Sequence, residues 1–208
     1  MELNTAHRIS SLQALEALYG TPATASIKKE VTYIHPYYRK LVEAASFAVL
    51  ATNGPDGLDA SPRGDPAGFI RVHDEKTLLL PDRRGNNRID SLRNIIYDPR
   101  VAILFLIPGV GETLRINGRA TITTDPAWLE QFPMGGKFPS SVLVIDVDKV
   151  FFQCSRAILR SRLWDPAFHV GRASLPSAGA ILEALSNAEI DGQKYDAELP
   201  ARVEKTLY

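Results

Sequence analysis

Residues 78–94 have the sequence Leu-Leu-Leu-Pro-Asp-Arg-Arg-Gly-Asn-Asn-Arg-Ile-Asp-Ser-Leu-Arg-Asn, in which a short apolar run passes through a cationic, amide-rich turn into a helical pattern. The apolar run ends at Pro81, Gly85 gives the backbone freedom to turn, and Asn87 is a favourable N-cap for the helix that follows. Apolar residues then recur at helical spacing until Asp98-Pro99 ends the element. The segment therefore predicts a strand, a turn and a helix in succession.

The predicted helix start places positive charge beside free backbone N–H groups. Those groups have no partner inside the helix, and the helix dipole favours an anion next to them. Arg83, Arg84 and Arg88 add charge-assisted hydrogen bonds, which are roughly twice as strong as neutral ones. We expect a seat for a phosphate here. A solvated basic turn in front of an ordinary helix explains the same residues, and the segment alone leaves both interpretations open.

The rest of the chain predicts a mainly β protein with flanking helices. Short apolar or alternating runs bounded by turn residues predict strands at 47–51, 58–61, 68–72, 77–80, 101–107, 113–123 and 142–152, with a bend or bulge at Asn117-Gly118. Helices are expected over the leucines at 12, 15 and 18, capped by Ser10 or Ser11 and ended at Gly20, and over 36–45, after Asp125, and over 155–163 and 178–186. The tail beyond Asp191 is expected to be loosely held. Because the strands do not alternate regularly with helices, an antiparallel barrel is favoured over a doubly wound sheet.

Composition argues against several classes of protein. The chain has 208 residues, enough for one substantial domain, and its 24 basic residues balance 24 acidic ones, which gives no reason to expect a nucleic-acid or membrane partner. Positive charge is local: residues 83–119 contain seven arginines and three acids, whereas residues 183–208 contain six acids and three bases. This distribution suits a small anionic ligand. With one cysteine and no long apolar segment, we expect a cytoplasmic protein.

The sequence contains no self-sufficient catalytic or metal-binding motif. Gly109-Val110-Gly111 and Gly135-Gly136-Lys137 lack the other residues of nucleotide-binding loops, so both are interpreted as turns. The four histidines are scattered, and Cys154 has no second cysteine with which to bind zinc, so no metal is expected. Cys154 with His169 would make a nucleophile and base, but a lone cysteine after a strand is usually a small apolar residue. The catalytic residue is unknown, and we expect a cofactor to supply the reactive group.

Two further segments are candidates for the same site. Ser61-Pro62-Arg63-Gly64-Asp65 joins two predicted strands, where its charged residues reach the groove of the 83–88 turn if the strands pair; a tight turn held by a local ion pair is the alternative. Arg156 and Arg160 share one face of a predicted helix, with Trp164 one turn further. That arrangement suits a planar ligand carrying a phosphate, and a dimer contact or a packed tryptophan is the alternative.

Together these strings resemble the pyridoxamine 5′-phosphate oxidase-like flavoproteins, and more narrowly a bacterial branch described as probable FMN-dependent enzymes. The resemblance covers roughly residues 30 to 170 and is carried by residues 61–65, 79–88, 98–101, 114–120 and 161–164. Ser-Pro-Arg-Gly-Asp and Arg-Arg-Gly-Asn-Asn-Arg are its specific parts.

The resemblance implies an antiparallel six-stranded split β-barrel, as a homodimer that binds FMN at the subunit interface and acts as an oxidoreductase on an unidentified small molecule. Residues 1–45 would be an N-terminal helical extension, 46–165 the FMN-binding barrel and 166–208 a C-terminal helical tail packing on the barrel. Arg88 would hold the phosphate, Pro81 and Asp82 would follow the flavin edge, and the C-terminal residues would approach from the partner subunit. The implied cofactor-binding residues are Ser61, Arg63, Gly64, Asp65, Pro81, Asp82, Arg83, Arg84, Asn86, Asn87, Arg88, Arg160, Ser161 and Trp164.

Two departures from that family bear on the activity. The chain lacks the Arg-x-Val-Leu-Leu-Lys string and the C-terminal Arg-Leu-His-Asp-Arg segment of pyridoxamine phosphate oxidases, which argues against oxidation of vitamin B6 phosphates. Relatives of this kind also bind deazaflavin F420 or haem, and a fold does not fix a function. A non-catalytic flavin-binding or sensing protein is the alternative hypothesis. Nucleic-acid binding is disfavoured by the zero net charge.

Overall fold

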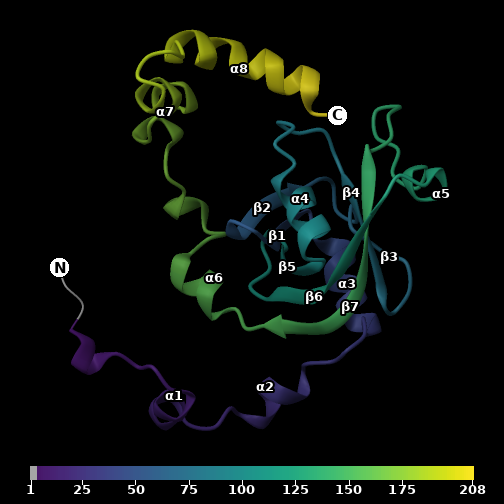
Figure 1. Cartoon of the computed structure of the whole chain (residues 1–208), viewed down its shortest axis with the longest axis vertical. Coiled ribbons are helices and arrows are strands. Elements are labelled where there is room, and N and C mark those ends of the chain that lie inside the picture. Colours follow the sequence, from purple (N-terminus) through teal and green to yellow (C-terminus); the bar gives the residue numbers. More distant parts are fainter. Residues whose placement is uncertain (1–3) are drawn as a thin grey trace. The chain divides into compact units, whose positions relative to one another are not determined.

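Alternating burial along the central strands produces one antiparallel sheet. In β5 (Arg100–Leu106) and β6 (Thr113–Thr123), every second side chain is buried over most of the strand, as a sheet with one covered face requires. The computed structural model describes residues 4–208 and adds β1 (Phe47–Gly54), β2 (Gly57–Gly64), β3 (Arg71–Val72), β4 (Thr77–Asp82) and β7 (Ser141–Gln153). The strand order is β2-β1-β5-β6-β7-β4-β3, with every pair antiparallel (Figure 1).

The predicted class, a mainly antiparallel β fold with flanking helices, is confirmed. The number of strands was wrong by one: the sheet has seven strands instead of six. The extra strand, β3, has only two residues at the edge of the sheet. The strand predicted at 68–72 contains β3, so the count of six that the family resemblance implied is what differs from the structure.

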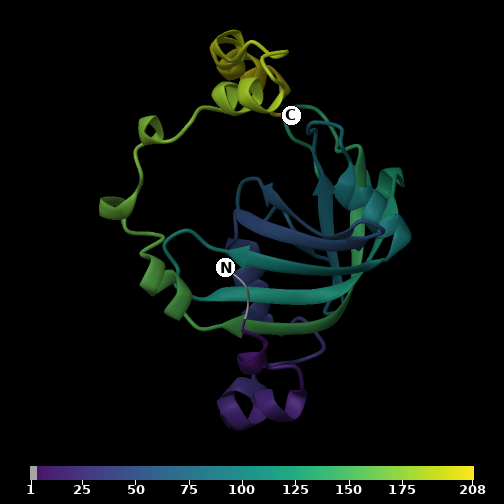
Figure 2. The ribbon, with the colours of Figure 1, turned by 60° about the vertical axis from the view of Figure 1, so that its left-hand side comes forward.

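A bulge bends the sheet where the sequence allowed one. The register between β6 and β7 shifts between Asn117 and Gly118, which confirms the prediction. A Cβ atom on Gly118 would collide with the backbone oxygen of Asp146, so the two strands approach more closely than any other residue permits. The sheet is strongly curved beyond this point (Figure 2).

The core fills the inside of this curve. Its largest fully buried side chains include Leu50, Ile103, Phe105, Leu114 and Leu143, which come from four different strands. The helix α3 (Pro36–Ala44) contributes the buried Val42, and α4 (Asp90–Tyr97) contributes Ile95. α4 packs on β1, which fixes the start of this helix near the outer strands.

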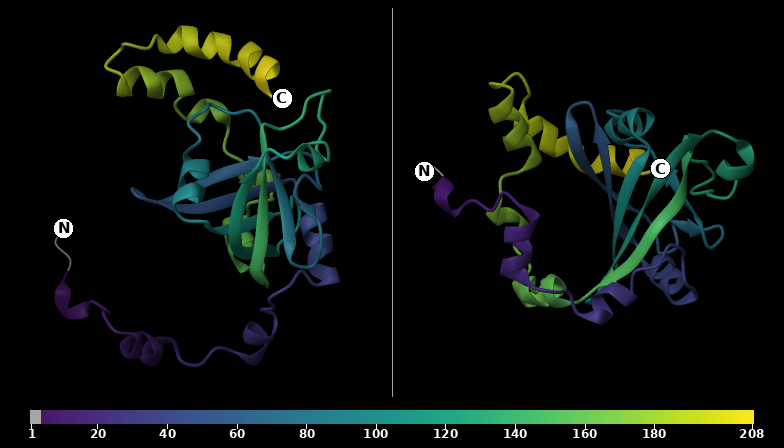
Figure 3. Two further views of the ribbon diagram at one scale, coloured as in Figure 1. Left: turned by 45° about the vertical axis from the view of Figure 1, so that its right-hand side comes forward. Right: turned by 60° about the horizontal axis from the view of Figure 1, so that its bottom comes forward.

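The segments around the barrel are helical. Between strands lies α5 (Pro126–Leu129), and after the barrel come α6 (Arg156–Ser161), the 3-10 turns η2 (Pro166–Phe168) and η3 (Arg172–Ser174), α7 (Ala178–Leu185) and α8 (Gly192–Thr206). α7 and α8 lie side by side (Figure 3). The expectation of a loosely held tail beyond Asp191 was wrong, because Asp191 caps α8 by accepting from the N–H of Lys194 at 2.9 Å.

The chain divides into two compact units between Glu30 and Val31. The described part of the first unit contains η1 (Thr5–His7), α1 (Leu12–Tyr19) and α2 (Thr24–Lys28). Ser11 caps α1 by accepting from the N–H of Ala14, and Gly20 ends it at a φ of 70°. The helix α3 belongs to the second unit together with the barrel, so this unit begins before residue 46.

Candidate functional site

A cavity of about 570 Å³ lies where the ends of β2, β4 and β7 meet the loop that leads from β4 to α4. We name it the loop cavity. Its charged lining consists of the arginines Arg63, Arg83, Arg84 and Arg88 and the aspartates Asp59, Asp82 and Asp90, and its serines are Ser61, Ser91, Ser140 and Ser141. The segment 78–94 and the segment 61–65 therefore lie at one site, as the sequence predicted.

Two ion pairs bridge strands that do not pair through their backbones. β2 and β4 lie far apart in the strand order, yet Arg63 Nη1 lies 3.4 Å from Asp82 Oδ1, and Arg83 Nε lies 2.9 Å from Asp65 Oδ2. Arg83 also donates to the backbone oxygen of Phe132 at 2.8 Å. These contacts hold the open side of the curved sheet together at the loop cavity. The alternative interpretation, a local ion pair within 61–65, does not hold, because Arg63 and Asp65 pair with Asp82 and Arg83 across the split.

The ion pairs around the loop cavity differ in how deeply they are buried, and burial changes the pKa of a carboxyl group. Burial raises the pKa of Asp82, and the nearby Arg63 guanidinium opposes this rise. The pair formed by Arg88 Nε and Asp90 Oδ2 is short, at 2.7 Å, but the Arg88 side chain is 74% exposed. Arg84 has no hydrogen-bond or charge partner among residues 4–208. Three of the four arginines are thus matched by carboxylates, and Arg84 is available to an anion.

The turn before α4 has an unusual backbone. Asn87 and Ile89 adopt left-handed conformations, with φ of 60° and 53°. A β-branched residue in this region is strained, and strain of this kind tends to occur at functional sites. The helix begins at Asp90 with Ile89 as its N-cap, so the predictions of a start at Arg88 and of Asn87 as the cap were wrong. Asn86 instead accepts from the N–H of Arg88 at 3.1 Å, which holds the turn.

A short hydrogen-bond chain forms another wall of the loop cavity. Ser91 Oγ donates to Asp59 Oδ2 at 3.3 Å and lies 2.9 Å from Ser61 Oγ. Because a hydroxyl carries one hydrogen, Ser61 is the donor to Ser91, and its own oxygen still accepts. The sequence interpretation missed Asp59 and Ser91. Alternation along β2 was the available signal, since residues 59, 61 and 63 share one face of that strand.

The other predicted residues lie at varied distances from this cavity. Gly64 and Asp65 end or follow β2 and Pro81 lies within β4, all three beside the lining residues without lining the cavity themselves. Asn86 and Asn87 line it. Three residues lie outside it: Arg160 and Ser161 are in α6, where Ser161 donates to the Ile158 oxygen, and Trp164 donates to the Val110 oxygen at 2.8 Å.

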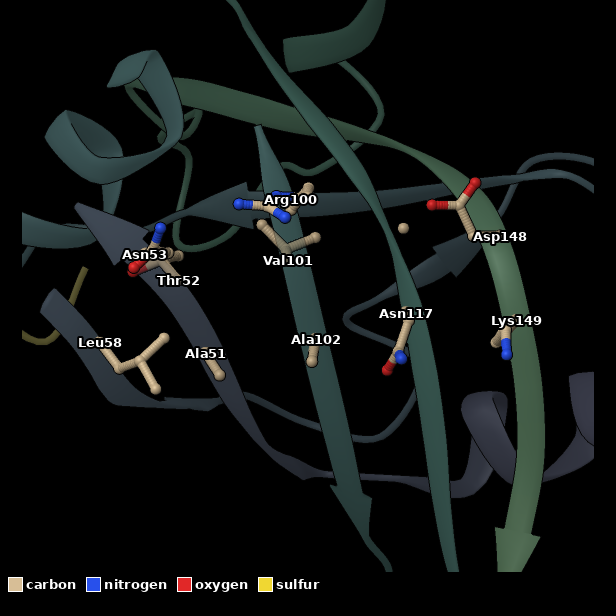
Figure 4. A pocket seen from close by; sticks show the side chains of 11 residues that line it. Ala51, Thr52, Asn53, Leu58, Arg100, Val101, Ala102, Asn117, Asp148 and Lys149 are labelled. Atoms are coloured by element: carbon tan, nitrogen blue, oxygen red, sulfur yellow. The ribbon is translucent and has the colours of Figure 1, made fainter. Parts of the chain in front are cut away.

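A second hollow, of about 560 Å³, lies on the regular face of the sheet (Figure 4). We name it the sheet hollow; it is lined by Ala51, Thr52, Asn53, Leu58, Arg100, Val101, Ala102, Asn117, Gly118, Asp148 and Lys149. Arg100 pairs with Asp98 at 2.5 Å, and Asn53 donates to the same carboxylate at 3.1 Å. These hydrogen bonds, led by that of Arg100, lower the pKa of Asp98. Asn117 Oδ1 is buried without a partner in the described structure.

Within residues 4–208, no group of three or more histidine, cysteine, aspartate or glutamate side chains could hold a metal ion. In the same part of the chain, no helix has both the length and the apolar character needed to cross a membrane.

The fold and the loop cavity define a class of protein: an antiparallel barrel whose open side forms an arginine-rich cavity. Residues 34–154, more than half of the chain, match the family model described as pyridoxamine 5′-phosphate oxidase. The chain belongs to this family, and its fold is the split barrel. No curated protein gives a significant match.

Several solved structures are similar to this chain. HupZ from Group A Streptococcus is 24% identical, with a TM-score of 0.47, and the match covers 59% of this chain and 95% of that one. A protein from Clostridium acetobutylicum related to general stress protein 26 is 16% identical, with a TM-score of 0.43 and coverages of 55% and 84%. A NimC/NimA family protein from the same organism is 18% identical, with a TM-score of 0.37 and coverages of 56% and 91%.

Proposed function

We propose that this protein binds FMN in the loop cavity and uses it as the redox cofactor of an oxidoreductase that acts on a small molecule. The observation that carries the proposal is the cluster of four arginines around one cavity, with Arg84 unmatched by any carboxylate in the described chain. Membership of the pyridoxamine 5′-phosphate oxidase family supports the same choice of cofactor. The departures at Ser-Pro-Arg-Gly-Asp and at the C-terminus argue for a substrate other than a vitamin B6 phosphate.

The donors of the loop cavity fit a phosphorylated cofactor. Arg63 Nε is buried and has no acceptor among the described residues, and a buried donor without an acceptor is costly. A phosphate oxygen would satisfy it. Arg84 and Arg88 would add charge, and Asn86 and Asn87 would add amide donors from the turn. The cavity thus offers what the phosphate end of FMN needs.

The protein side of the chemistry consists of binding and positioning. Bound FMN would supply hydride or electron transfer, which no side chain of this cavity performs. Asp82 lies at the wall of the cavity with a raised pKa, so its carboxyl group can hold or release a proton closer to neutral pH than an ordinary aspartate. The hydroxyl chain of Ser61 and Ser91 presents oxygen atoms to the same space.

Reconstitution of the purified protein with FMN tests the proposal. We expect a bound-flavin absorption spectrum and quenched flavin fluorescence, and we expect Arg88→Ala to weaken binding about tenfold through loss of a charged hydrogen bond. Arg93→Ala is the matched control, because Arg93 lies exposed on α4, just after the turn that carries Arg88, and does not line the cavity. A protein that binds F420 or haem but no FMN would overturn the assignment. Bound FMN that neither NADH, NADPH nor candidate substrates reduce without oxygen would favour a sensing role.

We further propose that the protein acts as a homodimer with the cofactor at the subunit interface. Arg160, Ser161 and Trp164 lie outside the loop cavity of their own chain, so a role at the cofactor requires that they come from the partner subunit. Arg160→Ala should then weaken FMN binding although this side chain is exposed in one chain. Light scattering that gives the mass of one chain, with unchanged FMN affinity in Arg160→Ala, would contradict the dimer.

A further inference from the structure

A third cavity, of about 420 Å³, adjoins the loop cavity. We name it the side cavity. It shares Arg83, Arg84, Asn87 and Ser140 with the loop cavity. Its other walls come from the loop between α5 and β7 and from Tyr208, which follows α8. A ligand in the side cavity would therefore lie next to whatever occupies the loop cavity.

The side chains that line the side cavity include cations and no acids. Three cationic residues line it, Arg83, Arg84 and Lys137, and no aspartate or glutamate does. Arg83 is already satisfied by Asp65 and by the Phe132 oxygen. Lys137 Nζ donates to the backbone oxygen of Tyr208 at 2.7 Å, and the ammonium has further hydrogens with which to bind a ligand. The loop cavity differs, since three aspartates face its four arginines. The side cavity is thus the more cationic of the two.

Aromatic and apolar side chains form the remaining walls. Phe138 is 56% exposed, and Met134 and Pro139 lie in the same loop. Tyr208 contributes a second ring, which is held from two sides. Its hydroxyl donates to Asp65 Oδ1 at 2.7 Å, and the guanidinium of Arg83 lies 5.9 Å from the ring centre. The hydrogen bond to Asp65 raises the pKa of Tyr208, so the hydroxyl keeps its proton and remains a donor.

A tight hairpin positions Lys137. Met134 and Lys137 exchange two backbone hydrogen bonds of 2.9 and 3.0 Å across Gly135 and Gly136. Both glycines have positive φ, 55° and 75°, which other residues rarely adopt. The loop is therefore built to present Lys137 in one place.

We propose that the side cavity is the substrate subsite and that it takes a small planar organic anion, such as an aromatic carboxylate. Lys137 would bind the anionic group, while Arg84 remains with the FMN phosphate, and Tyr208 and Phe138 would contact the faces of the ring. This inference rests on the proposed FMN-dependent function for the reaction that follows, but the binding itself depends only on residues of the side cavity.

Ligand-observed NMR on the full chain tests the subsite, with benzoate as the probe and neutral benzamide and non-aromatic cyclohexanecarboxylate as comparisons. We expect benzoate to bind at least fivefold more tightly than either. Lys137→Gln should weaken benzoate at least fivefold, because it removes the charge of a residue that lies outside the loop cavity. Lys149→Gln, in the sheet hollow, is the matched control and should leave benzoate binding unchanged.

The same experiment separates this proposal from the proposed function. Benzoate should bind with or without FMN, because the two ligands occupy adjoining cavities. If FMN does not bind while benzoate binding depends on Lys137, the cofactor assignment fails and the subsite stands. If benzamide binds as well as benzoate, if saturating FMN displaces benzoate, or if Lys137→Gln has no effect, the subsite is overturned. Phe138→Ala gives a second variant: it should reduce the preference for benzoate over cyclohexanecarboxylate, and an unchanged preference would also contradict the proposal.

Discussion

The loop cavity and the sheet hollow have nearly equal volumes, about 570 and 560 Å³, but they are built from different parts of the fold. The loop cavity lies at strand ends and in a turn with two left-handed residues, Asn87 and Ile89. The sheet hollow lies over β1, β5, β6 and β7, where residues of neighbouring strands line it (Figure 4). The first contains four arginines and the second only Arg100, which is paired with Asp98.

The difference shows how this fold separates recognition from support. In the loop cavity, Arg63 contacts the Asp82 carboxylate through Nη1, and its buried Nε has no partner in the described structure. A ligand can therefore bind to Nε or replace the contact with Asp82. In the sheet hollow the strands pair on both sides and Arg100 is matched by Asp98, while the buried atom without a partner in the described structure, Asn117 Oδ1, is a neutral acceptor that cannot bind a phosphate oxygen. The two hollows have similar volumes, but their charge and backbone conformation predict opposite effects of substitution on FMN affinity and on stability.

Arg63→Ala should have the largest effect. The change removes a half-buried guanidinium whose buried Nε we place at the FMN phosphate, and it leaves Asp82 without its ion-pair partner. FMN affinity should fall by about 10- to 100-fold, the range for a charged hydrogen bond, as measured by fluorescence quenching. Arg100→Ala is the control from the sheet hollow and should change the affinity less than about twofold. Equal losses of FMN affinity in both variants would contradict the proposed distinction between the loop cavity and the sheet hollow.

Gly118→Ala should instead damage the scaffold. A Cβ atom at this bulge would meet the backbone of Asp146, which cannot move aside as a flexible side chain could. Unfolding free energy should fall by about 1 to 3 kcal/mol, as for overpacking in a filled interior. Gly85→Ala makes the same change in the loop cavity, where a Cβ meets nothing within 4 Å. Denaturant unfolding should show little change for Gly85→Ala, and a similar loss in both variants would contradict the argument.

The sequence predicted most of the sheet because alternation and apolar runs report burial directly. β6 is an example: its alternating side chains and the bulge at Asn117-Gly118 were both predicted from residue types. The two segments of the loop cavity were also found, since arginines, asparagines and glycine accumulate there. The pairing of Arg63 with Asp82 and of Arg83 with Asp65 was not, because it depends on how far the sheet curls.

The errors at the helix start have a similar cause. Propensity favours Asn87 as the cap, but the cap is Ile89 in a left-handed conformation, and no local rule anticipates a β-branched residue there. The α8 helix was missed for another reason. Its sequence is polar with Pro200 inside it, and its order comes from contact with α7, where Gly179 and Gly192 allow close approach.

Asp82→Asn should produce a smaller effect of opposite sign. It removes the carboxylate that competes with a phosphate for Arg63, so FMN affinity at pH 7 should rise about two- to fivefold, below about 1 kcal/mol. Burial raises the pKa of Asp82, so the charged form costs stability above that raised pKa, and the cost disappears as the pH falls through it. The variant should therefore gain thermal stability at pH 7 and lose that advantage in acid. A loss of FMN affinity would show that the carboxylate contacts the cofactor favourably.

Asp98→Asn should give the smallest effect, confined to the sheet hollow. Hydrogen bonds from Arg100 and Asn53 lower the pKa of Asp98, so its contribution to stability is present above the ordinary aspartate pKa of about 4 and is lost as the pH falls through the lowered value. Thermal unfolding should find the variant slightly less stable at pH 7, with the difference shrinking in strong acid and in high salt, because the pair is near solvent. Asp148→Asn, in the same hollow and without a partner in the described chain, should show no such difference. FMN affinity should be unchanged in both variants, and a change in either would mean that the sheet hollow takes part in cofactor binding.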